Sequence, residues 1–215
     1  MGWSGSARAA CARGLSLGAL LLLAGACSAT RPDRPNDLCS IFYERPEWYA
    51  AARSSYRRWG VPVPLQLAVI RHESGFDSDA KPPRTRILWL IPGPRPSSAY
   101  GYGQVLDGTW DTYQDSTGGT FADRDDFADV TDFIGWYGDV GERRFGIPRN
   151  DPYAFWLSYH EGQYGYARGT HRNKPSVLIV ARKVDWLART YESQYEACRT
   201  NLDNIADDSS WWPFG

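Results

Sequence analysis

The chain has 215 residues and a formal net charge of −1, with 24 basic and 25 acidic residues. A balance so close to neutral excludes the basic surface on which nucleic-acid-binding proteins depend, so no nucleic-acid partner is expected. The length suits one domain of ordinary size with room for a hydrophobic core, once the N-terminal segment described next has been removed.

Residues 1–26 have the pattern of a cleavable export signal. They contain two arginines and no acidic residue, and an apolar stretch runs from Leu15 to Ala24. About ten apolar residues are too few to span a bilayer, which takes roughly 20, so this segment is predicted to be removed rather than to anchor the chain. Its removal takes two of the 24 basic residues and leaves 22 against 25 acidic ones, a net charge of about −3.

Two processing routes fit the end of this segment. Ala24-Gly25-Ala26 matches the small residues of ordinary secretory cleavage. The same stretch resembles a bacterial lipobox, in which Cys27 becomes the acylated first residue, although Ala24 stands where lipoboxes usually carry Leu. In that case residues 27–37 are a lipidated N-terminus and tether, and the lipid attaches the protein to a membrane.

The cysteine count helps to choose between these routes. The chain has four cysteines, and Cys11 lies inside the signal. Ordinary cleavage would leave three, one of them unpaired, whereas lipidation of Cys27 leaves Cys39 and Cys198 as a pair. An oxidising periplasm favours a disulfide, which would tie the first and last helices together and stabilise the domain by about 2–4 kcal/mol. The alternative is two buried free thiols.

The rest of the chain is predicted to be mostly helical. Helices are expected over 38–59 with an interruption near Pro46, over 65–73, 105–114, 130–145, 152–159 and 176–198, and an acidic and aromatic tail over 203–215. Residues 78–98 contain five prolines and cannot form a long helix. Within them Arg86–Ile91 is a strand-like apolar run, which is either one side of a small β-hairpin or a segment packed on the core.

Glu73 ends the second of these helices and is the candidate catalytic residue. Five of the six residues 65–70 are apolar, too many for one stripe, so the helix is predicted to be buried nearly all round. Gly75 suits the left-handed position after a helix, which places Glu73 in the last turn at the negative end of the helix dipole. Burial and the dipole would both raise its pKa, as a general acid requires. The alternative is a solvated glutamate at a helix end.

Three short motifs follow one another along the chain. Glu73–Phe76 reads Glu-Ser-Gly-Phe, Ala99–Gln104 reads Ala-Tyr-Gly-Tyr-Gly-Gln, and Ser158–Gly162 reads Ser-Tyr-His-Glu-Gly. The first matches the signature around the catalytic glutamate of soluble-lytic-transglycosylase (SLT) domains. The second is similar to the family's Ala-x-Gly-Leu-x-Gln, and the third stands where the family has Ala-Tyr-Asn-Ala-Gly. Over roughly residues 55–170 the chain therefore resembles the lysozyme-like lytic transglycosylases.

The resemblance implies a mainly α, lysozyme-like domain of the goose-type lysozyme and SLT class over residues 38–202. It implies cleavage of the β-1,4 bond between N-acetylmuramic acid and N-acetylglucosamine in peptidoglycan, with formation of 1,6-anhydromuramic acid. In this family one glutamate acts as acid and then as base, so Glu73 would serve both steps without a cofactor. The three histidines are widely separated and no His-Glu-x-x-His motif is present, so no metal site is expected.

The same resemblance assigns substrate-binding roles. Ser74 would hydrogen-bond the substrate near the scissile bond, and Gln104 would contact the substrate or orient Glu73. The hydroxyl of Tyr159 would hold Glu73. Plainer alternatives are that Ser74 only caps a helix and that Tyr159 is a core aromatic residue. Tyr102 replaces the family's usual Leu and would reshape the sugar-binding wall, or else pack in the core.

Glu161, which replaces the family's usual Ala, allows two interpretations. If its carboxylate faced the cleft opposite Glu73, at about 6.5–9.5 Å, it could activate water and make the protein an inverting muramidase. It could instead pair with His160 or Arg168 in a structural network.

Ser28 is not the Asp that retains lipoproteins in the inner membrane, so a lipidated chain is expected on the outer membrane, facing the periplasm. The rival function is a catalytically silent peptidoglycan-binding lipoprotein of the envelope, against which the presence of Glu73 argues. The ten Trp and 13 Tyr residues are many for this length, and such side chains often line carbohydrate clefts, although they more commonly fill cores. Protein partners stay unknown from the sequence.

Overall fold

A computed structural model describes residues 31–87 and 91–208 of the chain. The predicted export signal, the candidate lipidation site Cys27 and the last seven residues lie outside these ranges. Within them no helix is both long enough and apolar enough to cross a membrane. The elements in chain order are α1 (Leu38–Glu44), α2 (Pro46–Trp59), α3 (Val63–Glu73), β1 (Arg86–Ile87), β2 (Ile91–Pro92), α4 (Asp107–Thr117), α5 (Phe127–Phe145), α6 (Pro152–Glu161), α7 (Gln163–Ala167) and α8 (Pro175–Asp208).

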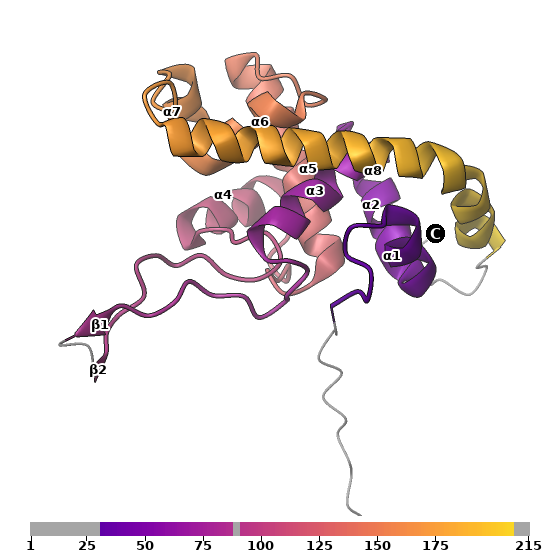
Figure 1. Ribbon diagram of the computed structural model, residues 1–215, viewed down its shortest axis with the longest axis horizontal. Coiled ribbons are helices and arrows are strands. Elements are labelled where there is room, and N and C mark those ends of the chain that lie inside the picture. The colour runs from indigo at the N-terminus through magenta and orange to yellow at the C-terminus, as the bar shows by residue number, and fades with distance from the viewer. Residues whose placement is uncertain (1–30, 88–90, 209–215) are drawn as a thin grey trace, which may run out of the picture.

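The mainly α fold is confirmed, and every segment predicted to be helical contains a helix. The interruption near Pro46 separates α1 from α2, because the fixed φ of proline suits the first turn of a new helix. The short helix α7 was not predicted, and it follows Gly162, whose φ of +73° ends α6. In Figure 1 the long helix α8 lies across the other helices, while β1 and β2 extend away from the helical body.

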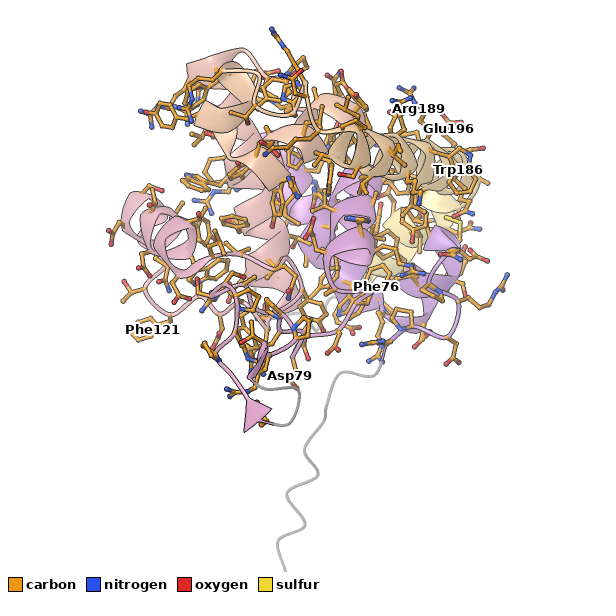
Figure 2. All side chains as sticks on the ribbon, turned by 60° about the vertical axis from the view of Figure 1, so that its left-hand side comes forward. Phe76, Asp79, Phe121, Trp186, Arg189 and Glu196 are labelled. Carbon is orange, nitrogen blue, oxygen red and sulfur yellow. A yellow bond between two sulfur atoms is a disulfide. The ribbon has the colours of Figure 1, made fainter. Side chains whose placement is uncertain are left out.

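Helix α3 is buried nearly all round, as its sequence predicts. All residues from Val63 to Ile70 are buried, and Glu73 is the last residue of the helix. Gly75 takes the expected left-handed conformation with φ of +64°, and Phe76 follows with φ of +66° and a fully buried side chain. In Figure 2 Phe76 lies at the end of α3, and Asp79 lies where the chain leaves for β1.

The predicted hairpin in the loop 78–98 is present and small. β1 pairs antiparallel with β2, with Arg86 opposite Pro92 and Ile87 opposite Ile91. Two further backbone hydrogen bonds extend the pairing, from Thr85 N–H to the Pro94 carbonyl at 3.0 Å and from Gly93 N–H to the Thr85 carbonyl at 2.7 Å. The strand-like run therefore contributes Arg86 and Ile87 to one strand and Ile91 to the other, where the sequence suggested one side of a hairpin.

Aromatic side chains form a large part of the core. Trp48 of α2 stacks on Phe127 of α5 with ring centroids 4.1 Å apart, and Tyr102 meets both rings edge-on at 5.7 and 5.5 Å. Helices α2 and α5 approach closely because Gly135 has no side chain, and a Cβ there would lie 2.5 Å from Ser55 Oγ. At these positions the abundant aromatic residues serve packing, the plainer of the two interpretations of the composition.

The predicted disulfide between Cys39 and Cys198 is present, with Cα atoms 6.1 Å apart, and it ties α1 to α8. Helix α8 continues to Asp208, well into the segment predicted to be a tail. The extension is explained by its acidic residues, which face α2. Tyr49 O–H donates to Asp203 at 2.6 Å, and the Arg53 guanidinium donates to Asp207 at 2.7 Å.

Candidate active site

Glu73 combines burial with one strong hydrogen bond. Its Oε1 accepts a hydrogen bond of 3.0 Å from the indole Nε1–H of Trp156. Burial raises the pKa of the Glu73 carboxyl to about 7, and the bond from Trp156 acts in the opposite direction because it favours the charged form. A carboxyl group with this pKa can give and take a proton near neutral pH. The raised pKa predicted from the sequence is therefore present, with burial as its main cause.

The local sequence explains why Trp156 reaches Glu73. Helix α6 begins cleanly because the Asp151 carboxylate accepts hydrogen bonds from the first free N–H groups, at 3.0 and 3.1 Å. Trp156 then lies in the second turn and is 2% exposed. Two imidazoles contact its ring, His72 at 5.1 Å edge-on and His160 at 5.1 Å tilted by 36°. The indole is thus fixed by its surroundings, as a group that orients a carboxylate must be.

Tyr159 lies near Glu73 but does not bind it, contrary to the role that the resemblance assigned. Its hydroxyl donates to the Gly103 carbonyl at 2.8 Å. Burial, followed by the charge of Glu73, raises the pKa of Tyr159 well above the ordinary value. At Gly103 a Cβ would lie 2.9 Å from this hydroxyl, so the glycine is needed for the contact. Tyr159 therefore joins α6 to the Ala99–Gln104 motif beside the carboxylate.

Gln104 holds the backbone of its own loop. Its Nε2 donates to the Ala80 carbonyl at 2.8 Å and to the Gly101 carbonyl at 2.9 Å, with the residue itself at φ of +50°. No hydrogen bond joins it to Glu73 within the described ranges. The amide thus links the start of the hairpin loop to its end, and the expected orientation of Glu73 by Gln104 is wrong for this structure.

Ser74 and Tyr102, the two other residues predicted to contact the substrate, contact other parts of the protein. The Ser74 hydroxyl donates to the Ile70 carbonyl at 3.2 Å, which is the capping role given above as the plainer alternative. Tyr102 is 2% exposed and packs edge-on against the stacked rings of Trp48 and Phe127. Its replacement of the family's Leu therefore alters core packing, and the proposal that Tyr102 forms part of the sugar-binding wall is wrong.

Glu161 belongs to a structural network. Its carboxylate accepts hydrogen bonds from Lys174 Nζ at 2.8 Å and from the Thr170 hydroxyl, and it contacts His160 Nδ1 at 3.2 Å. The bond from Lys174, then that from Thr170, lowers the pKa of Glu161 to about 2. The predicted pairing with His160 is confirmed, but the cation of the network is Lys174 rather than Arg168. A carboxylate so stabilised is a weak base for activating water.

Sequence reasoning missed Trp156. The available signal was its position three residues before Tyr159, because residues three apart in a helix share a face. Trp156 therefore had to lie on the side of α6 that carries the third motif. The sequence offered no sign that its N–H would meet Glu73, which is 83 residues away in the chain.

Comparison with known protein families identifies the family of the chain. Residues 15–198 match the family described as the transglycosylase SLT domain. Comparisons with curated proteins and with solved structures each find no match. The matched range contains Glu73, Trp156 and all three motifs and covers most of the chain. Together with the mainly α fold, it shows that the chain belongs to the transglycosylase SLT domain family.

Proposed function

We propose that the protein is a peptidoglycan lytic transglycosylase in which Glu73 acts first as a general acid and then as a general base. Membership of the SLT family implies lytic transglycosylase activity on the glycan strands of the cell envelope. The observation that carries the finer proposal is the Glu73 carboxyl, which is partly buried at the end of α3 and has its pKa raised to about 7.

The chemistry requires no second carboxylate. Neutral Glu73 gives its proton to the glycosidic oxygen as the bond from that oxygen to C1 of the muramic residue breaks. The oxocarbenium-like centre is supported by the substrate's own N-acetyl carbonyl. Ionised Glu73 then takes the proton of the C6 hydroxyl, whose oxygen bonds to C1 and closes the anhydro ring. Glu73 ends neutral, no water is consumed, and a pKa near 7 makes both of its forms accessible.

The test is mass spectrometry of the soluble fragments released from purified peptidoglycan by the wild-type protein and by Glu73→Gln. We expect fragments ending in 1,6-anhydromuramic acid from the wild type and none from the variant. Fragments ending in reducing muramic acid would show a hydrolase and overturn the proposal. Wall binding without release by either protein would favour the silent binding protein.

Glu161→Gln should leave the product unchanged. The Lys174 and Thr170 bonds engage the Glu161 carboxylate, so removing its charge should alter the rate of release by less than about tenfold. Mass spectrometry of the fragments that Glu161→Gln releases from purified peptidoglycan should again show ends of 1,6-anhydromuramic acid. A change in the chemistry of the ends would revive the muramidase interpretation. Export and lipidation at Cys27 stay predictions from the sequence.

A further inference from the structure

The donor that meets Glu73 limits where its proton can be. An indole N–H can only donate a hydrogen bond, and it has no acceptor to offer in return. Oε1 of Glu73, which Trp156 contacts at 3.0 Å, must therefore accept in both the neutral and the ionised state. Because the carbonyl oxygen of a neutral carboxyl is a better acceptor than its hydroxyl oxygen, we place the proton of neutral Glu73 on Oε2.

Oε2 is also the oxygen that another molecule can reach. Within the described ranges Oε2 of Glu73 makes no hydrogen bond. It is also not among the polar side-chain atoms there that are both fully buried and unpaired. An unpaired atom that is not fully buried must be in contact with solvent, so solvent touches Oε2 of Glu73. One oxygen of Glu73 is thus held by the protein and the other is in contact with solvent.

We propose that Trp156 is a positioning residue, which reserves Oε1 of Glu73 and leaves Oε2 to carry the catalytic proton in both steps. The proposal rests on the function proposed above for Glu73. In the first step the O–H bond at Oε2 breaks as the proton goes to the glycosidic oxygen. In the second step Oε2 takes the proton of the C6 hydroxyl. Throughout, the Trp156 N–H stabilises the ionised state between the steps.

A chain of contacts fixes this indole from outside the site. His160 lies against Trp156 at 5.1 Å and is held through Nδ1 by Glu161, which Lys174 and Thr170 hold in turn. His160 and Glu161 are the two residues that replace the family's Asn-Ala. The departures from the family motif and the tryptophan therefore form one unit, whose inner end is the hydrogen bond to Glu73.

A second imidazole, that of His72, also contacts the indole. His72 meets it edge-on at 5.1 Å. Burial lowers the pKa of His72, and the charges of His160, Lys183 and Arg71 lower it further. His72 is therefore neutral at pH 7 and adds no cation beside Glu73.

The direct test follows Trp156 in the folded wild-type protein. With ¹⁵N-labelled tryptophan, the indole N–H resonance of Trp156, assigned with Trp156→Phe, should move with pH at the pKa of Glu73. In Glu73→Gln the transition at the pKa of Glu73 should be lost, whatever response the two imidazoles in contact with the ring still cause, because the carboxylate charge is gone. A resonance that does not respond to pH in the wild type would overturn the proposal, even if Glu73→Gln proves inactive.

The functional test is Trp156→Phe, which keeps an aromatic ring in the site but removes the N–H group. We expect kcat to fall by roughly tenfold to a hundredfold with little change in KM, because a hydrogen bond to the developing carboxylate is lost. The pKa of Glu73 should rise by about one unit, because the charged form loses its donor. The alkaline limb of the pH–rate profile should therefore move to higher pH.

The matched control is Trp110→Phe. Trp110 of α4 is 5% exposed and packs on Tyr113 and Phe133, so its replacement also removes an indole from the core. It should leave the alkaline limb in place. A slower Trp156→Phe whose limb does not move would reduce Trp156 to a packing residue and overturn the proposal. Full activity of Glu73→Gln would instead overturn the proposed function, so the two failures are distinguishable.

Discussion

Glu73→Gln is expected to be more stable than the wild-type protein at pH 8, although it should be inactive. In the folded protein the pKa of Glu73 is raised from 4.5 to about 7. Between these two values the folded chain binds more protons than the unfolded chain, so stability falls as the pH rises. Above pH 7 the full penalty is present, about 3 kcal/mol for a shift of this size. Glutamine carries no charge, and its carbonyl can still accept the Trp156 N–H.

The measurement is urea unfolding of both proteins at pH 4 and pH 8. The advantage of Glu73→Gln should be present at pH 8 and absent at pH 4, where Glu73 is protonated in both states. Glu161→Gln is a control whose stability should change in the opposite direction, with a loss at pH 8 where Glu73→Gln shows a gain. Because the pKa of Glu161 is lowered to about 2, its charge stabilises the fold above its ordinary pKa, and this is lost as the pH falls towards 2. A Glu73→Gln variant no more stable than the wild type at pH 8 would contradict the raised pKa.

This expected gain has a functional explanation. Burial makes the Glu73 carboxyl costly to ionise, and the Trp156 N–H offsets only part of that cost. The arrangement lowers stability where the group must be charged, yet it also makes the neutral acid available near pH 7. The site therefore lowers the stability of the fold and gains a carboxyl group that can give and take a proton near pH 7.

The parts of the site that depend on neighbouring residues could be predicted from the sequence. Six consecutive positions, five of them apolar, require burial on all sides of α3, and Gly75 takes the left-handed conformation that ends it. The place of Glu73 follows from these two facts. The helix pattern of α6 was equally local, because Pro152 and the capping Asp151 define its start. Such features depend only on residues within one helical turn of each other, so the sequence alone predicts them.

The contacts between elements could not be predicted in this way. The Tyr159 hydroxyl donates to Gly103, and Tyr102 lies inside the core. Both contacts join the loop between α3 and α4 to elements far from it in the sequence, and the spacing of residues does not predict such contacts. The length of α8 was missed for a related reason. Asp203 and Asp207 look like an acidic tail until Tyr49 and Arg53 of α2 lie opposite them.

Removing the disulfide is expected to be the most destabilising change outside the active site. The bridge joins Cys39 to Cys198 across 159 residues of chain, so it restricts nearly the whole unfolded domain. Cys39→Ala with Cys198→Ala should lower the free energy of unfolding by about 2–5 kcal/mol. In thermal unfolding this corresponds to a loss of about 5–15 °C for a domain of this size.

The reduced fold should nevertheless survive, because α1 keeps other attachments to α8. The Gln194 side chain accepts from Leu38 N–H at 2.8 Å and donates to the Asn36 carbonyl at 3.1 Å. A reductant should therefore lower the melting temperature of the wild type to that of the double variant and leave the double variant unchanged. Equal melting temperatures without reductant would show that the bridge does not stabilise the fold. Since Glu73 and Trp156 lie on α3 and α6, away from the bridge, the double variant should release fragments at the wild-type rate at temperatures where it is folded.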